Sequence, residues 1–293
     1  MSKKKKPEPR AHKKCSPSTS SRWMNCPGSV AAIEAIPKHL RRKTSKYANE
    51  GTAAHKLLEM CLRKDQDADE YADRVIRVLT DEHGASTAHL AMKGSKHYGD
   101  CEESSFKVNK NMIEAVQTCI DHVRDEVDRL RKKYGDPVEV VLEAKCVPYD
   151  DTDEASGTGD VIITAWPHEI VVIDYKHGSG VLVQIGGNTQ MRCYMMGHAR
   201  LDHFNFKKGK VTIAQPRYNH EDGPVRSEYV SMKELQEFRD EVREAVRRTE
   251  RPNAKFAAGD WCKWCDAAET CKTLKKWQGQ QAARDFEEVG EDE

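Results

Sequence analysis

The feature that most constrains the fold is a change of hydrophobic period in the middle of the chain. From 106 to 134, apolar residues recur at three- and four-residue steps, which is typical of an amphipathic helix. From 138 onward the pattern changes to short runs rich in Val and Ile, separated by turn residues. These runs predict strands at 138–147, 159–165 and 170–175. A small sheet with helices before and after it predicts a mixed α/β fold.

The remaining elements follow from the same periodicities. Ser16 and Pro17 mark a helix start, since Ser caps a helix and Pro suits its first turn. Helices are expected at 47–62, 68–80, 188–199 and 231–249. We expect a loop at 82–104 and short strands at 211–215 and 227–230.

The 293 residues are enough for one large domain with a substantial core. We expect a disordered basic arm at 1–15 and an acidic tail at 276–293, with a single domain at 16–275 between them. Within that domain we expect a helical part (16–134), a catalytic core (135–230), and a C-terminal helix with a cysteine cluster (231–275).

Charge gives no global indication of a nucleic-acid binder, because 48 Lys and Arg balance 48 Asp and Glu. The balance hides an uneven distribution, since basic residues dominate from 3 to 46 and acidic residues from 285 to 293. The basic start is not followed by an apolar segment, and no apolar run approaches the roughly 18 residues of a membrane span. We therefore expect a cytoplasmic protein.

Two acidic residues stand at the ends of neighbouring expected strands. In a hairpin, Asp160 and Asp174 would lie side by side, and two carboxylates that repel each other are suited to a divalent cation. Their hard oxygen ligands favour Mg²⁺ or Mn²⁺. Lys176 follows Asp174 by two residues, so both side chains face the same side and the lysine can hold a water or balance phosphate charge.

Each short motif in this region is common by itself. An Asp-x-Lys at a strand end is mostly a solvated pair, a Gly-x-x-Asp is mostly a turn, and a lone helical His is mostly an ordinary polar residue. Their order is more specific, and it resembles the RecB-like branch of the PD-(D/E)xK nuclease superfamily. The resemblance rests on four motifs: Gly51-x-x-x-His55, Gly157-x-x-Asp160, Asp174-x-Lys176 and Gln190-x-x-x-Tyr194.

The resemblance implies a restriction-endonuclease-like core, in which a small mixed sheet is flanked by helices. It also implies that His55, Asp160 and Asp174 bind the metal, with the Tyr175 carbonyl as a further ligand. Lys176 would position the attacking water. Gln190 and Tyr194 would support Lys176 and the DNA backbone. Metal-assisted phosphodiester hydrolysis needs such groups, and the chain has no ATP-binding P-loop motif of its own.

Ten cysteines without a secretion signal favour metal ligands over disulfides. Cys262, Cys265 and Cys271 form a C-x2-C-x5-C group that lacks a fourth ligand, for which Cys26 is the best candidate. Cys61 and Cys119 occupy apolar helical positions and are expected in the core, and Cys15 falls in the expected arm. The spacing suits a zinc site and an iron–sulfur site equally well.

The cysteine layout resembles the AddB nuclease domain and the CRISPR-associated RecB-like nucleases. There, one cysteine ahead of the nuclease motifs and a C-x2-C-x5-C group after them hold a 4Fe-4S cluster. The resemblance therefore implies a structural 4Fe-4S cluster on Cys26, Cys262, Cys265 and Cys271, with structural Zn²⁺ as the alternative. Either group would tie the N-terminal helices to the C-terminal segment.

Basic residues near the motifs are candidates for phosphate contacts, although a solvated surface explains them equally well. These candidates are Arg22, Arg41, Arg42, Lys43 and Arg192. The function expected from the resemblance is a metal-dependent, sequence-nonspecific DNA exonuclease of phage or bacterial recombination or DNA-end processing, in the host cytoplasm if phage-encoded. The expected partners are ends of linear DNA and a single-strand annealing protein, recombinase or helicase. The alternatives are an endonuclease or flap nuclease of the same fold, a catalytically silent DNA-binding or assembly module, and an adaptor protein that is stabilised by zinc and has no nucleic-acid role.

Overall fold

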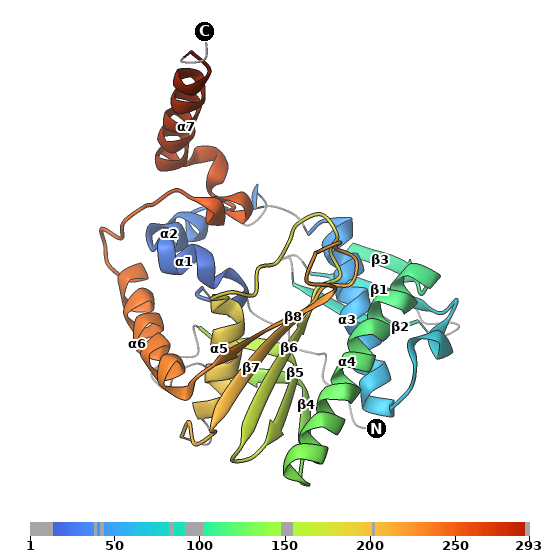
Figure 1. The fold of residues 1–293 in the computed structure, drawn as a ribbon. Coiled ribbons are helices and arrows are strands. Elements are labelled where there is room, and N and C mark those ends of the chain that lie inside the picture. Colours follow the sequence, from blue (N-terminus) through green and yellow to red (C-terminus); the bar gives the residue numbers. More distant parts are fainter. Residues whose placement is uncertain are drawn as a thin grey trace, which may run out of the picture.

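A computed structural model describes residues 14–37, 40–41, 44–81, 85–91, 102–147, 155–200 and 203–290; of residue 102 and residues 285–290 it describes the backbone only. The chain forms two β-sheets with helices around them, so the expected mixed α/β fold is confirmed (Figure 1). None of the helices in these ranges combines the length and hydropathy that a membrane span needs.

The N-terminal segment forms the short helices η1 (Pro17–Thr19), α1 (Ser20–Asn25) and α2 (Gly28–Glu34). The helix breaks at Cys26, as the Cys-Pro-Gly sequence predicts. Gly28 is required where the chain packs against a distant segment, because its N–H donates to the Lys255 carbonyl over 2.9 Å and a Cβ would lie 2.8 Å from the Ala254 carbonyl oxygen. The start and the end of the chain therefore meet here.

Two long helices cover one face of the larger sheet. In α3 (Lys46–Lys64), the Ser45 hydroxyl caps the N-terminus by accepting from the Ala48 N–H. In α4 (Lys110–Tyr134), the Asn109 side chain caps the N-terminus in the same way. Their apolar faces pack on the sheet in one hydrophobic core. The expected helix over 47–62 is confirmed, and the one over 106–134 begins only at Lys110.

A small antiparallel sheet, ordered β2-β1-β3, lies between these helices in sequence and packs on α3. Its strands are β1 (Val75–Thr80), β2 (Ser86–Leu90) and β3 (Glu102–Lys107). The expected helix over 68–80 and the expected loop over 82–104 are wrong here. Only the 3-10 turn η3 (Ala68–Tyr71) precedes β1, where Ile76 and Val78 alternate into the helical core, as β-branched residues favour.

The larger sheet has the order β4-β5-β6-β7-β8, and only the β6–β7 pair is parallel. Its strands are β4 (Glu139–Cys146), β5 (Gly157–Ala165), β6 (Glu169–Tyr175), β7 (Lys208–Ala214) and β8 (Val225–Val230). A parallel pair needs a crossover, which α5 (Thr189–Ala199) provides. All the strands predicted for this mixed sheet are present.

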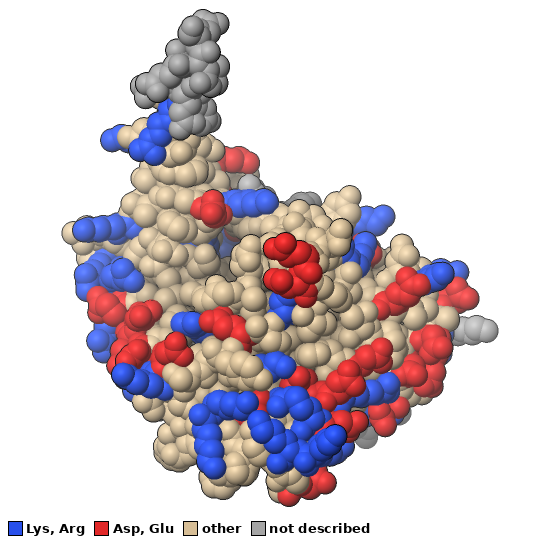
Figure 2. All heavy atoms as spheres, in the orientation of Figure 1, with Lys and Arg blue, Asp and Glu red and all other residues tan. Residues whose placement is uncertain are grey.

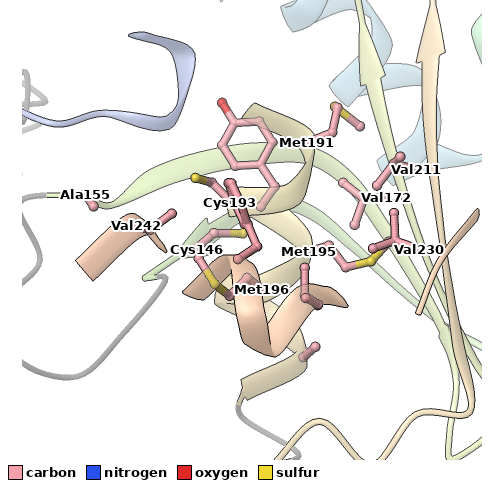
Figure 3. Packing of buried hydrophobic residues seen from close by; sticks show 14 of the residues in the cluster. Cys146, Ala155, Val172, Met191, Cys193, Met195, Met196, Val211, Val230 and Val242 are labelled. Atoms are coloured by element: carbon pink, nitrogen blue, oxygen red, sulfur yellow. The ribbon is translucent and has the colours of Figure 1, made fainter. Parts of the chain in front are cut away.

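The second face of the sheet is covered by α5 and α6 (Met232–Thr249), with α1 beside them. Figure 3 shows the methionines of α5 packed against Cys146, Val172 and Val211, where unbranched side chains fill an irregular space. Gly197 permits this approach, because a Cβ there would lie 2.8 Å from the Cβ of Cys146. Helix α5 is therefore fixed closely on the sheet.

The start of β6 carries a buried group of charges. The Glu169 side chain is fully buried, with Arg129 Nη2 at 2.6 Å and Lys208 Nζ at 3.2 Å. Glu126 on α4 lies 2.8 Å from the same guanidinium nitrogen and 2.7 Å from Lys210 Nζ. Figure 2 shows Lys and Arg side chains gathered at this lower end of the sheet. Each buried acid here is paired with two basic side chains.

The C-terminal segment contains η5 (Asp260–Trp264) and η6 (Ala268–Thr270), followed by α7 (Lys272–Gly290). Helix α7 projects from the body beside α1 and α2 (Figure 1). The residues expected as an acidic tail at 276–293 are therefore helical as far as Gly290.

Candidate functional site

Two buried carboxylates face each other at one end of the larger sheet. Val161 of β5 pairs with Ile173 of β6, so the next position along the ladder sets Asp160 opposite Asp174. The Asp174 side chain is 3% exposed and that of Asp160 is 13% exposed, so neither is well solvated. The antiparallel register brings together two acids that are 14 residues apart in the chain.

Helix α3 brings His55 to this pair. Its Nδ1 lies 3.3 Å from Asp160 Oδ2, and its ring makes an edge contact with Tyr175 at 5.4 Å between centroids. The same Asp160 oxygen accepts the Tyr175 N–H over 2.8 Å. Asp160 is thus held from a helix and from the neighbouring strand at once.

Lys176 and helix α5 complete the group. Lys176 Nζ lies 2.7 Å from Asp174 Oδ2 and donates to Gln190 Oε1 over 3.4 Å. The Gln190 amide nitrogen donates to Asp174 Oδ1 over 3.2 Å and contacts the Tyr194 hydroxyl at 3.1 Å. All six side chains that the sequence singled out as catalytic therefore lie in one cluster.

The two carboxylates are electrostatically different. Burial raises the pKa of Asp174, and repulsion from Asp160 adds to it, although the Lys176 ammonium opposes both. Burial also opposes ionisation of Asp160, but His55 and Lys176 lower its pKa below the usual value. Burial disfavours the His55 imidazolium, yet the two carboxylates raise its pKa. The positive charge that can balance the two acids therefore comes from Lys176 and from the His55 imidazolium.

The donors at this site fit a divalent cation. Within the described ranges, no group of three or more His, Cys, Asp or Glu side chains is positioned as it would be around a metal ion. Asp174 Oδ2 is buried with the Lys176 ammonium 2.7 Å away, and a cation bound there would take the place of that ammonium. Two carboxylates and one imidazole nitrogen are ligands that Mg²⁺ or Mn²⁺ accepts.

A second network, absent from the sequence-based set, supports Tyr175. Its hydroxyl lies 2.7 Å from His177 Nδ1, and His177 Nε2 lies 3.4 Å from Glu50 Oε1, which also accepts from Arg217 over 3.1 Å. Burial and then the Arg217 charge lower the pKa of His177 to about 4, so this imidazole is neutral. The sequence offers one signal for these two residues, which is their position next to the motifs. Glu50 directly precedes Gly51 of the first motif, and His177 directly follows Lys176 of the third motif.

Four cysteines line one cavity between the α1–α2 turn and the C-terminal segment. They are the predicted ligands Cys26, Cys262, Cys265 and Cys271. Backbone N–H groups point at three of the sulfurs: Ala257 donates to Cys26 and Leu274 to Cys271, each over 3.4 Å, and Ala267 donates to Cys265. Donors of this kind stabilise metal-bound thiolates, which makes these four cysteines a candidate ligand set.

The other cysteines in the described ranges lie elsewhere. Cys61 and Cys119 are fully buried in the helical core, as predicted, and burial raises the pKa of Cys61 to about 12. Cys146 at the end of β4 and Cys193 on α5 are buried together in the core on the second face of the larger sheet. Cys15 does not belong to a free arm, because it is 2% exposed and its sulfur lies 3.7 Å from the Thr249 hydroxyl.

The candidate phosphate contacts are dispersed. Arg22 lines the cysteine cavity and donates to the Ser29 hydroxyl over 3.0 Å. Arg41 donates to backbone carbonyls at the end of α2, and Arg192 is paired with Glu228 at 3.1 Å. The other two candidates, Arg42 and Lys43, lie outside the described residues. The three described arginines do not converge on the carboxylate pair.

The fold and the site define a mixed α/β protein with a candidate metal-binding site at one end of its larger sheet. The chain belongs to the family described as "Protein of unknown function (DUF2800)", which matches residues 12–291. A solved structure titled "Crystal structure of SSO0001" aligns at 17% identity with a TM-score of 0.29, covering 55% of this chain and 71% of that one. A similarity this low supports no conclusion about fold or function.

Proposed function

We propose that this protein is a metal-dependent DNA exonuclease with a PD-(D/E)xK core of the RecB-like branch. The observation that carries the proposal is the convergence of four separated motifs, spread over residues 51–194, on one pair of buried carboxylates. A structural role would not require two neighbouring, poorly solvated carboxylates with a histidine on one and a lysine on the other. Such an arrangement costs stability unless a cation completes it.

The side chains divide into a binding set and a positioning set. Asp160, Asp174 and His55 would hold Mg²⁺ or Mn²⁺, together with the Tyr175 carbonyl. When bound, the ion supplies a Lewis acid for the phosphate and lowers the pKa of a coordinated water. The Lys176 ammonium would hold a water or a phosphate oxygen through hydrogen bonds, as a positive group at the buried carboxylates.

Gln190 and Tyr194 act as positioning residues in this proposal. The Gln190 amide bonds to Asp174 with its nitrogen and to Lys176 with its oxygen, so it fixes the distance between acid and lysine. The buried Tyr194 contacts that amide nitrogen and fixes its orientation. The Glu50–His177–Tyr175 network holds the strand end that carries the acid and the lysine.

The nuclease proposal is tested with linear and circular DNA, single- and double-stranded, in Mg²⁺, in Mn²⁺ and in EDTA. We expect degradation of linear DNA only, its loss in EDTA, and its loss in Lys176→Ala. Lys56→Ala is the matched control, because Lys56 lies on α3 and pairs only with Glu59 among the described contacts. Activity that persists in Lys176→Ala would refute the site. Cleavage of circles would select an endonuclease, and binding without cleavage a silent module.

We also propose that the cysteine cavity holds a structural 4Fe-4S cluster, with Zn²⁺ as the alternative. Cys26→Ala should lose the bound metal and lower the free energy of unfolding by several kcal/mol, because the metal joins segments more than 230 residues apart. Cys61→Ala is the matched control, as it truncates an equally buried thiol outside the cavity. Brown colour with a broad visible absorbance selects iron–sulfur over zinc. Full metal content in Cys26→Ala would refute the ligand assignment.

A further inference from the structure

A groove of about 620 Å³ adjoins the cysteine cavity and shares Cys262, Ala268 and Leu274 with it, while the carboxylate site does not use it. Its walls come from η5, from the first turns of α7 and from the loop between β6 and α5, through Val181. Trp264 and Trp277 both line it, and the Trp264 side chain is 68% exposed. A volume of this size falls within the range of ligand sites. An exposed tryptophan in an open groove, with a half-buried second one in the same lining, is costly for a polar protein to leave without a partner.

The charge around the groove favours an anionic partner. Lys263 lines it and lies 5.6 Å from the centre of the Trp264 ring, while Asp260 is the acidic side chain in its lining. Helix α7, which projects from the body in Figures 1 and 2, carries only basic charges from 272 to 284. These basic residues are Lys272, Lys275, Lys276 and Arg284.

The groove is connected to the carboxylate site by a fixed loop. Val181 belongs to the segment between Lys176 and Gln190, so both ends of this segment carry site residues. The buried Gln215 side chain pins the loop: it donates to the carbonyls of Gly178 and Val181 over 3.0 and 2.8 Å and accepts from the Val183 N–H over 3.1 Å. The loop that contributes Val181 to the groove is therefore the same fixed loop that joins Lys176 to Gln190.

We propose that this groove binds single-stranded DNA, with bases stacked on Trp264 and Trp277 and phosphates near Lys263 and α7. Stacking needs the open face of a base, which a single strand offers and a duplex hides within its own stack. The paired aromatic and basic groups suit a polyanion with flat bases better than they suit an apolar peptide. Binding of a single strand in the groove does not require cleavage at the carboxylate site, so the inference can hold even if the proposed nuclease function fails.

The test measures the affinity of the full-length protein for a labelled oligothymidine and for a duplex of equal length, by fluorescence anisotropy without divalent metal. We expect Trp264→Ala to weaken single-strand binding by roughly 5- to 100-fold, the range for loss of one stacked base. Trp264→Phe should keep most of the affinity, because a phenyl ring still stacks. Trp166→Ala is the matched control, since Trp166 is 58% exposed in the turn between β5 and β6, at the far end of the sheet.

The outcomes separate the two proposals. Unchanged affinity in Trp264→Ala, an equal loss in Trp166→Ala, or equal losses for duplex and single strand would each overturn the groove assignment. A folded wild-type protein that binds no oligonucleotide would also overturn it and would leave a protein partner as the occupant to test. Cleavage that depends on Lys176 but not on Trp264 would leave the nuclease proposal standing alone. Trp264-dependent binding without cleavage would leave only the groove.

Discussion

Strand β6 carries a buried acid at each end, and the two ends are built in opposite ways. At its start, Glu169 and the neighbouring Glu126 are each paired with two basic side chains, and these partners outweigh burial and lower the pKa of both acids. At its end, Asp174 faces Asp160, and each acid has one basic partner among the described contacts, Lys176 on Asp174 and His55 on Asp160; burial raises the pKa of Asp174. The same strand thus separates acids with two basic partners each from acids with one each. The second group is where an added cation would lower the energy.

The sharpest test of this comparison is Asp174→Asn. The amide can still accept the hydrogen bond from Gln190, so we expect the folded state to persist with its midpoint of unfolding within a few degrees of wild type. Nuclease activity in Mg²⁺ should fall about 10³-fold or more, since several kcal/mol of charge stabilisation are lost. The measurements are initial rates on linear DNA and thermal unfolding. Loss of the fold together with the activity would mean that the two ends of β6 do not differ as described.

The reciprocal change, Glu169→Gln, should act on stability and leave the chemistry intact. It removes the carboxylate charge that Arg129 and Lys208 share, while Arg129 keeps Glu126 and both bases stay partly exposed, so we expect a cost of about 1.5 to 3 kcal/mol. Because the folded pKa of Glu169 is lowered, its contribution is present above the unfolded pKa of about 4.3 and is lost as pH falls through the folded value.

The gap between wild type and Glu169→Gln in urea unfolding should therefore be full at pH 7 and should shrink below about pH 4. Activity per folded molecule at low temperature should stay unchanged. A gap that is independent of pH would show that the carboxylate charge is not the source of the stability.

A smaller effect is expected from Tyr134→Phe. The Tyr134 hydroxyl donates to Glu169 over 3.1 Å, beside the stronger pairing with Arg129. Its removal should cost about 1 kcal/mol, because the acid keeps its ionic partners. The phenyl ring preserves the stacking on His168, whose ring centroid lies 4.6 Å away. Denaturant unfolding measures the difference, and a loss as large as that of Glu169→Gln would show that the group depends on all its members together.

The long elements were predictable because they repeat one period many times. Helix α4 and the Val- and Ile-rich strands β5 and β6 leave little ambiguity. The small sheet was missed because β2 and β3 are short and rich in Ser, Thr, Glu and His, so they show no clear alternation. In β1, the apolar spacing also fits a helix, and packing against α3 decides for a strand.

The residues of the site also differ in how far apart they lie in the chain, and this distance decides which of them the sequence predicts. Motif order predicts the neighbours of Asp174, because the hairpin and the crossover helix that carry them are local in the chain. Glu50 and Arg217 meet across 167 residues, through a loop after β7 that reaches α3. No periodicity in either segment encodes that contact, which exists only once α3 has packed on the sheet.

The cysteine cavity is lined by residues from both ends of the chain, so it can form only late in translation. Cys26 leaves the ribosome early, whereas Cys271 follows the last strand and α6. The five strands of the larger sheet are therefore available before the cavity can close, and translation of nearly the whole domain precedes any occupant bound by all four thiols. A ribosome-bound chain halted before residue 262 would contain all strands of the larger sheet, but Cys26 would still lack the three C-terminal cysteines that complete the cavity.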